Sequence, residues 1–475
     1  MAILTCYECE GKVSSLARAC PHCGAPVENR LIRVVESGDV HVLEDLITKG
    51  ANVNSADQSG WTPLMKAAEL GRSDMMQVLL RSGADFGVAD ESGASALMWA
   101  VSTGNTEAIK MLLDAGADTG SAKDDGNNAL IWAAAQGHAD VAELLINGGA
   151  DVNTANENGK TPLMEACSRG HMDFAKILVD KGAVVDTQDN KGETALFKSA
   201  KAGHADIVEF LLQNRADLDA KALRWAAAGA HLSVVKVLLD NGLSANAANP
   251  AGVTPLMRAA LMGHPKVVNM LLERGADPRA KDCEGWPAVI LAAREGHLRI
   301  VQLLLDAGAE VNCADANQWT PLLWAASLGH EDILAVVLRY GADVNYQDKY
   351  GATALMKACR RGYPAVATLL LEKGADPNIA DKDGATALMR ACRGGHTRLI
   401  KLLLMKGADV DAADKDGNTA LILAASEGHR EPVRLLLEEK PDVRARDKNG
   451  WTAMMWAASI RNKEIIALLE RHVAG

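Results

Sequence analysis

The chain has 475 residues, with 50 Lys and Arg against 61 Asp and Glu, so its formal net charge at pH 7 is −11. This balance excludes a chain-wide surface for polyanions, although it leaves room for a local basic patch. Aromatic residues make up only 4% of the composition while apolar residues make up 48%, which favours a core of thin, closely packed helices.

The chain shows no sequence feature of an exported or membrane-spanning protein. Its start, MAILTCYECEGK, has no charged segment followed by a signal-like apolar run, and no stretch of about 18 apolar residues occurs. Nine cysteines are too few for a secreted disulfide scaffold of this length. We therefore expect a cytoplasmic protein that does not enter a membrane.

The first predicted element is a metal site in residues 1–27. Cys6 and Cys9 form one C-x-x-C pair, and Cys20 and Cys23 form a second pair ten residues further on. Four thiolates from two turns match the tetrahedral coordination of a structural Zn²⁺ ion. A redox pair of the thioredoxin kind would need a strand-to-helix setting that this segment lacks. We predict that these four cysteines bind Zn²⁺.

The segment KVSSLARACPHCGAPV resembles the zinc ribbon found at the N-terminus of many bacterial proteins, in which each knuckle reads C-P-x-C-G. The second knuckle, from Cys20 to Gly24, has the full pattern, whereas the first has Glu10 in the Gly position. The resemblance implies a small domain whose folding depends on the metal. Its acidic and basic residues balance and Tyr7 is its only aromatic residue, which disfavours nucleic acid as a ligand.

From residue 28 onward the chain repeats with a period of 33 residues. The period is marked by Gly60, Gly93, Gly126, Gly159 and Gly192, and it resumes from Gly252 to Gly450 with Gln318 in one glycine position. At the finger tip, an Asp or Asn followed two positions later by Asn, Asp or Ser and then Gly suits a tight turn, and Thr161 with Pro162 is typical of a helix start. Paired small residues and then an apolar I/V-L-L run follow. We predict two short helices and one hairpin finger per unit.

The motifs D-x-x-G-x-T-P-L, A-A-x-x-G-H and V-x-L-L-L-x-x-G-A-D-V-N in these units resemble the ankyrin repeat. The resemblance covers residues 28–475 and implies an all-α solenoid of about fourteen helix pairs after the small zinc ribbon. It also implies recognition of a protein partner by the fingers and the concave groove. Where the family commonly has His after the first-helix Leu, this chain mostly has Met, so we expect one polar bond of that helix to be lost.

One finger is missing between the sixth and seventh units, near residues 217–223. Leu223 follows Asp217 without the D-x-x-G-x-T-P segment, and the spacing from Gly192 to Gly252 is six residues short of two periods. Two explanations stay open. The deletion is neutral, or it leaves a gap in the groove wall that admits a bulky element of a partner.

All nine tryptophans occupy two positions of the repeat. The turn slot, directly after the finger turn, holds Trp61, Trp286, Trp319 and Trp451. The helix slot, in the first helix, holds Trp99, Trp132, Trp225, Trp324 and Trp456. Both positions line the groove in the ankyrin family, so we predict partner contacts for Trp61, Trp99, Trp132, Trp286, Trp319 and Trp324. The alternative is that duplication copied a packing residue.

The groove positions become basic toward the C-terminus. Residues 349–413 contain eleven Lys or Arg against six Asp or Glu. The candidate partner-binding cations are Lys357, Arg360, Arg361, Arg390 and Arg393. They form either a solvated basic face or a seat for an acidic segment of a partner, with the tryptophans supplying apolar contacts.

No nucleophile with its base, pair of catalytic acid and base, phosphate loop or open metal site is recognisable in the sequence, so we do not predict an enzyme. We expect a non-enzymatic protein-binding scaffold or adaptor, with structural Zn²⁺ as its cofactor. The alternative is a regulatory protein that contacts nucleic acid through the zinc ribbon.

Overall fold

The computed structural model describes residues 3–5, 12–14 and 30–474. Within these ranges the chain forms two short strands followed by 28 helices. The strands β1 (Ile3–Thr5) and β2 (Lys12–Ser14) pair antiparallel, with Leu4 opposite Val13.

The helices alternate between a first and a second helix of each repeat, so that odd numbers mark first helices and even numbers mark second helices. In the first half of the chain they are α1 (Arg30–Ser37), α2 (Val40–Thr48), α3 (Pro63–Glu69), α4 (Ser73–Arg81), α5 (Ala96–Ser102), α6 (Thr106–Asp114), α7 (Ala129–Gln136), α8 (Ala139–Asn147), α9 (Pro162–Arg169), α10 (Met172–Asp180), α11 (Ala195–Ala202), α12 (Ala205–Gln213), α13 (Ala220–Ala228) and α14 (Leu232–Asp240). In the second half they are α15 (Pro255–Met262), α16 (Pro265–Glu273), α17 (Ala288–Glu295), α18 (Leu298–Asp306), α19 (Pro321–Leu328), α20 (Glu331–Arg339), α21 (Ala354–Arg361), α22 (Pro364–Glu372), α23 (Ala387–Arg393), α24 (Thr397–Met405), α25 (Ala420–Ser426), α26 (Arg430–Glu438), α27 (Ala453–Ser459) and α28 (Lys463–Ala474).

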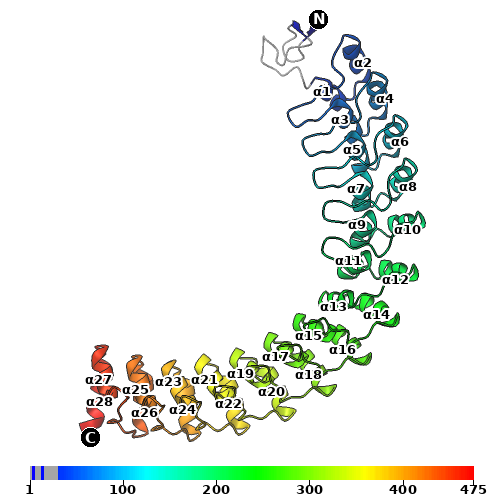
Figure 1. Ribbon diagram of the computed structural model, residues 1–475. Coiled ribbons are helices and arrows are strands. Elements are labelled where there is room, and N and C mark those ends of the chain that lie inside the picture. Colours follow the sequence, from blue (N-terminus) through cyan, green and yellow to red (C-terminus); the bar gives the residue numbers. More distant parts are fainter. Residues whose placement is uncertain (1–2, 6–11, 15–29, 475) are drawn as a thin grey trace. The chain divides into compact units, whose positions relative to one another are not determined.

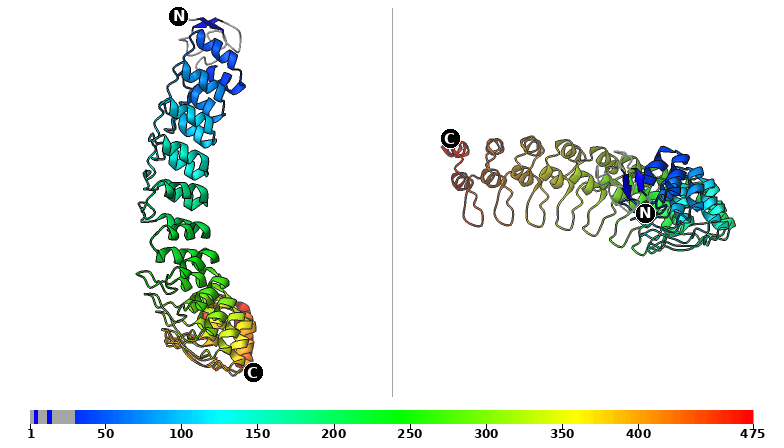
Figure 2. Two further views of the ribbon diagram at one scale, coloured as in Figure 1. Left: turned by 90° about the vertical axis from the view of Figure 1, so that its right-hand side faces the viewer. Right: turned by 90° about the horizontal axis from the view of Figure 1, so that it is seen from above.

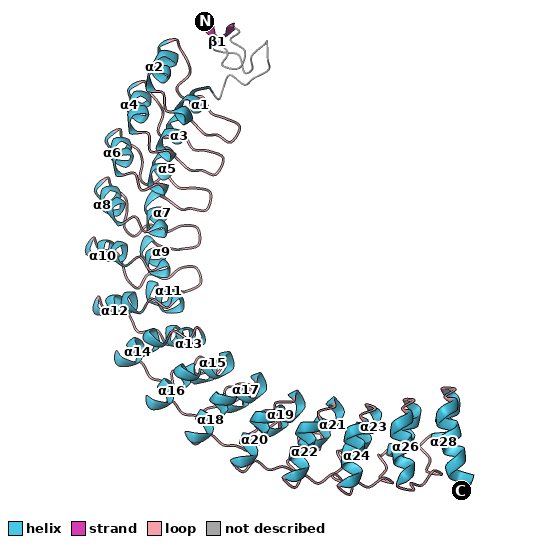
Figure 3. Cartoon of the chain, turned by 180° about the vertical axis from the view of Figure 1, so that it is seen from behind, coloured by secondary structure: helices cyan, strands magenta, loops and turns pink. Residues whose placement is uncertain are grey.

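The helices divide between two compact units. The first unit extends to Ala226 and includes Lys236–Leu243, and the second contains Ala227–Val235 and the chain from Ser244 onward. Within each unit, odd-numbered helices pack on odd-numbered helices and even-numbered helices on even-numbered ones (Figure 1). The hairpin fingers project from the odd-numbered row, as the view from behind also shows (Figure 3). The predicted stack of fourteen helix pairs is confirmed for the described residues.

Local chemistry explains where the first helices begin and end. In α9, the Thr161 hydroxyl oxygen accepts the Met164 backbone N–H at 3.3 Å, and Pro162 occupies the first turn. The helix ends at Gly170, whose φ of 84° is the left-handed conformation that glycine adopts without strain. The turn residues predicted from the sequence therefore set the helix boundaries.

The methionine that replaces the family's usual histidine takes over part of its bonding. The Met65 sulfur accepts the Thr62 backbone N–H at 3.4 Å, and Met257 does the same for Thr254. The expected loss of a polar bond is therefore wrong for these two repeats. The sulfur is a weaker acceptor than a nitrogen, but it allows the side chain to stay fully buried.

The core lies between the two rows of helices and is built from small and aliphatic side chains. In α9 the small residues Ala166 and Cys167 are fully buried, and in α10 so are Phe174 and Leu178. Small residues in the first helices allow neighbouring repeats to approach closely, and both helices of a repeat bury large apolar side chains, as Met164 in α9 also shows. The low aromatic content of the chain agrees with this core.

The fingers within a unit are joined to one another by backbone hydrogen bonds. The Lys382 N–H donates to the Tyr350 carbonyl at 2.8 Å, and the Lys415 N–H donates to the Asp383 carbonyl at the same distance. Successive fingers of the second unit thus lie side by side (Figure 2, right). These fingers are therefore held to their neighbours by hydrogen bonds and are not independent loops.

The repeat with the shortened sequence has no finger between its helices and those before it. Residues 214–219 alone connect α12 to α13, whereas residues 181–194 connect α10 to α11. Trp225, in the helix slot of this repeat, is 45% exposed. The same slot is half-buried wherever it holds Trp beside a finger, as at Trp99 and Trp324.

Candidate functional site

The predicted zinc ligands Cys6, Cys9, Cys20 and Cys23 lie outside the described residues. Among the residues that are described, no group of three or more His, Cys, Asp or Glu side chains is placed to hold a metal ion. The described helices also include none that is long and apolar enough to cross a membrane.

Three cysteines of the first helices serve as small packing residues. Cys167, Cys359 and Cys392 are fully buried, and burial raises the pKa of each thiol. They stay protonated at neutral pH, so they are poor nucleophiles. The surface of interest is therefore the row of odd-numbered helices with its fingers, which we call the finger-side face.

A finger carboxylate bonds to the helix slot nine residues later in several repeats. The Lys357 ammonium lies 2.6 Å from Asp348 Oδ2, and the Arg390 guanidinium lies 2.5 Å from Asp381 Oδ2. In two repeats whose slot holds Trp, the indole N–H donates instead, from Trp99 to Asp90 at 3.0 Å and from Trp324 to Asp315 at 3.3 Å. The other oxygen of each carboxylate accepts backbone N–H groups of its own finger turn. Helix and finger are thereby tied together.

These bonds change the role of two predicted partner-binding cations. Lys357 and Asp348 keep 12% and 0% of their side chains exposed, and Arg390 and Asp381 keep 27% and 4%. The two charges are compensated within the chain, so Lys357 and Arg390 hold the fingers and do not offer free cations. Burial alone would raise the pKa of Asp348, but the hydrogen bonds and charge of Lys357, with two backbone N–H groups, lower it overall.

The remaining predicted cations are exposed. Arg393 forms an exposed ion pair with Glu427 of the next repeat at 3.5 Å. One repeat earlier, Gly394 occupies the position equivalent to Glu427, so Arg360 meets no carboxylate there. Within the described part of the chain, Arg360 and Arg361 form no ion pair. Of the five predicted partner-binding cations, these two are the ones without an ion pair in the described residues.

The predicted tryptophans come together in two clusters, one in each unit. In the first unit, the ring centroids of Trp61 and Trp99 lie 4.4 Å apart, and those of Trp99 and Trp132 lie 5.9 Å apart. The Lys66 ammonium lies 4.3 Å from the Trp61 ring centroid, and the Lys123 ammonium lies 4.5 Å from the Trp132 ring centroid. The cluster is half-buried and has a cation on each outer ring.

The cluster of the second unit contains Trp286, Trp319 and Trp324. The ring centroid of Trp324 lies 4.6 Å from that of Trp319 and 5.6 Å from that of Trp286. Lys357 lies 4.3 Å from the Trp319 ring, and Arg294 lies 4.9 Å from the Trp286 ring. Both cations already have a carboxylate partner, Asp348 for Lys357 and Glu295 for Arg294 at 2.7 Å. Apolar surface and compensated charge therefore alternate here.

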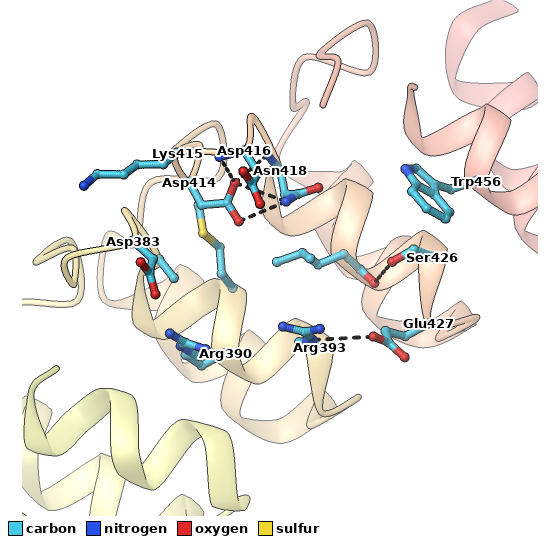
Figure 4. Close-up of a pocket in the computed structure, with 13 residues that line it drawn as sticks. Asp383, Arg390, Arg393, Asp414, Lys415, Asp416, Asn418, Ser426, Glu427 and Trp456 are labelled. Atoms are coloured by element: carbon cyan, nitrogen blue, oxygen red, sulfur yellow. Dashed lines mark hydrogen bonds and ion pairs between the residues drawn. The ribbon is translucent and has the colours of Figure 1, made fainter. Parts of the chain in front are cut away.

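A cavity of about 520 Å³ opens on the finger-side face of the second unit, next to the basic stretch. Figure 4 shows Arg390 and Arg393 on the helix side of this cavity, with Asp383 and Lys415 from the fingers. Arg360 and Arg361 occupy positions one repeat before those of Arg393 and Gly394. The period thus places the two free arginines on the same face as the cavity.

A second cavity, of about 420 Å³, lies on the finger-side face of the first unit. Trp132, Lys123 and Lys160 line it. Its charged groups are largely paired, since Glu165 bonds both Lys160, at 2.7 Å, and Arg169, at 3.3 Å. This cavity therefore presents less unbalanced positive charge than the arginine pair of the second unit.

The sequence interpretation missed the finger carboxylates that hold the helix slot. They are Asp90, Asp315, Asp348 and Asp381, together with Asp189, which bonds Lys198 at 2.6 Å, and Asp447, which bonds Trp456 at 2.9 Å. The signal that could have found them is the constant spacing of nine residues between an acidic finger residue and a slot residue able to donate a hydrogen bond.

Comparison with models of protein families supports this architecture. The model described as "Ankyrin repeats (3 copies)" matches residues 31–123, 82–156, 130–222, 219–282, 271–348, 289–381, 337–414 and 388–473. Comparison with curated proteins gave no match. Because the matched segments follow one another from residue 31 to residue 473, this chain belongs to the ankyrin-repeat family.

Proposed function

We propose that this chain is a non-enzymatic binding scaffold that recognises an acidic segment of a protein partner through the finger-side face of its second unit. Ankyrin repeats are in general modules of protein–protein interaction, and the choice of partner depends on the residues that each array exposes. The observation that carries the proposal is the pair of exposed arginines, Arg360 and Arg361, without a carboxylate partner in the described residues.

Two features make an acidic segment the fitting partner. Arginine binds carboxylates with two parallel hydrogen bonds, so two free guanidinium groups on neighbouring positions offer directional contacts as well as charge. Residues 349–413 are basic in a chain whose net charge is −11, so an acidic segment would be attracted to this region and repelled by others.

The test is affinity capture with the full chain and two charge-reversal variants. The first variant, Arg360→Glu/Arg361→Glu, changes the finger-side face. The matched control, Arg398→Glu/Lys401→Glu, makes the same change in net charge at exposed positions of α24 in the same unit. We expect the first variant to lose partners that carry acidic segments while the control retains them. Retention of every partner by both variants would contradict the proposal.

We further propose that Cys6, Cys9, Cys20 and Cys23 hold a structural Zn²⁺ ion. The support is their spacing and the complete C-P-x-C-G knuckle from Cys20 to Gly24. Four thiolates fill the coordination sphere, which suits a metal that stabilises a small fold and leaves no open position for chemistry. Such thiolates require a reducing compartment, in agreement with the proposed cytoplasmic location.

A further inference from the structure

We infer that the acidic segment recognised here also carries a bulky apolar side chain, which docks on the cluster of Trp286, Trp319 and Trp324. This inference rests on the proposed function and specifies its partner: an extended, acidic peptide segment with an aromatic or large aliphatic residue close to its acidic residues.

The tryptophan cluster offers apolar surface rather than charge. Its three rings are half-buried, and the cations above them, Arg294 and Lys357, are already neutralised by Glu295 and Asp348. Leu328, at the end of α19, leaves 40% of its surface exposed. An additional large apolar side chain on this surface would gain burial without displacing an ion pair.

The two free arginines follow one repeat after the cluster. Leu328 in α19 and Arg361 in α21 occupy equivalent positions of neighbouring repeats, so the face changes from apolar to cationic across one helix spacing. Neighbouring helices lie about 8 to 10 Å apart, and an extended chain rises about 3.3 Å per residue. An apolar residue on the tryptophans and an acidic residue on the arginines are therefore about three residues apart.

The tryptophan cluster of the first unit does not offer this combination. In the repeat that follows Trp132, the positions equivalent to Arg360 and Arg361 hold Ser168 and Arg169. Ser168 is uncharged, and Arg169 is paired with Glu165 at 3.3 Å. The second unit is thus favoured because free cations follow its aromatic cluster.

Two labelled synthetic peptides test the inference by fluorescence anisotropy with the full chain. The peptide EESSFSSEE places a central Phe three residues from Glu on both sides, so that its direction on the face does not matter. The comparison peptide, EESSSSSEE, has the same charge and lacks the Phe. We expect the Phe peptide to bind about tenfold more tightly, as the burial of one aromatic side chain implies.

Two tryptophan variants locate the binding. Trp319→Ala should reduce the affinity for the Phe peptide to that for the comparison peptide. Trp451→Ala is the matched control, because Trp451 occupies the same turn slot and packs on Trp456. Their ring centroids lie 4.9 Å apart, close to the 4.6 Å between the ring centroids of Trp319 and Trp324. This control should leave both affinities unchanged. Circular dichroism of each variant checks that the array remains folded.

The outcomes separate this inference from the proposed function. Both peptides could bind equally, with Arg360→Glu/Arg361→Glu weakening both. In that case the inferred docking of an apolar side chain is wrong, while the proposed binding of an acidic segment is supported. An equal loss in Trp319→Ala and Trp451→Ala also overturns the inference, because the second unit's cluster is then not the docking site. Failure of both peptides to bind overturns the inference and the acidic seat together.

Discussion

Lys357 in the first helix of one repeat and Asp348 in the finger before it form a largely buried ion pair, with Nζ and Oδ2 2.6 Å apart. The same carboxylate also accepts the backbone N–H groups of Tyr350 and Ala352 through its other oxygen. One aspartate therefore fixes the turn of the finger and joins the finger to the helix. Arg390 and Asp381 repeat this arrangement 33 residues later.

Removal of the lysine charge should destabilise the array. In Lys357→Met the buried Asp348 carboxylate loses its charged partner, and we expect the free energy of unfolding to fall by about 1.5 to 3 kcal/mol. Urea unfolding of the full chain, followed by circular dichroism, measures this change. Arg361→Ala, an exposed position in the same helix, is the control and should stay within about 0.5 kcal/mol of the parent. Equal unfolding free energies of the two variants would show that the ion pair between Lys357 and Asp348 does not stabilise the array.

The pair also predicts a dependence of stability on pH. The pKa of Asp348 is lower in the folded chain than in the unfolded chain, where it is about 3.9. Its contribution to stability is therefore present above pH 4 and is lost as the pH falls through the folded-state pKa. We expect the difference in unfolding free energy between the parent and Asp348→Asn to be largest near neutral pH and to shrink below about pH 4. A difference that stayed constant from pH 7 to pH 3 would contradict this account.

Much of the fold was predictable from the sequence because the repeat places turn residues where the backbone requires them. Gly170 in its left-handed conformation and the Thr161 cap are local features, so a single repeat reveals them. The pairing of Lys357 with Asp348 was not predicted. Composition marks both residues as exposed charges, and only the folded finger brings the carboxylate over the helix. Of the five cations predicted to bind a partner, Arg360 and Arg361 are therefore the two that form no ion pair in the described residues.

The two slots of the tryptophans were evident from the period, but the period does not say which rings meet. The structure pairs a turn-slot ring with a helix-slot ring, both within a repeat, as for Trp319 and Trp324, and between repeats, as for Trp61 and Trp99. It also shows that the Trp99 and Trp324 indole groups donate to finger carboxylates, so part of their role is structural.

Gln318 provides a test of the finger geometry. It occupies a glycine position with a φ of 58°, a left-handed conformation that costs a residue with a Cβ atom roughly 1 kcal/mol. We expect Gln318→Gly to raise the free energy of unfolding by up to about 1 kcal/mol, measured by urea unfolding.

The reverse change in another finger is the matched control. Gly384 has a φ of 82°, and a Cβ atom there would lie 3.0 Å from the Asp414 Cα and the Lys415 nitrogen. Gly384→Ala should therefore destabilise the array by more than Gln318→Gly stabilises it. If both changes leave the unfolding midpoint unaltered, the fingers do not contribute to stability as described.

The proposed zinc site predicts a defined metal content. Purified full-length chain should contain about one Zn²⁺ per chain, measured by atomic emission, and Cys20→Ser or Cys23→Ser should remove it. Cys283→Ser is the control, because this exposed finger cysteine lies outside the proposed ligand set. Zinc retained by both ligand variants, or absent from the parent, would contradict the assignment.

Arginine footprinting of the full chain with a captured partner shows which face of the second unit the partner covers. We expect Arg360 and Arg361 to lose reactivity toward an arginine-specific reagent when the partner is bound, while Arg398 in α24 stays reactive. Protection of Arg398 with Arg360 and Arg361 still reactive would place the partner on the even-numbered helices and contradict recognition through the finger-side face.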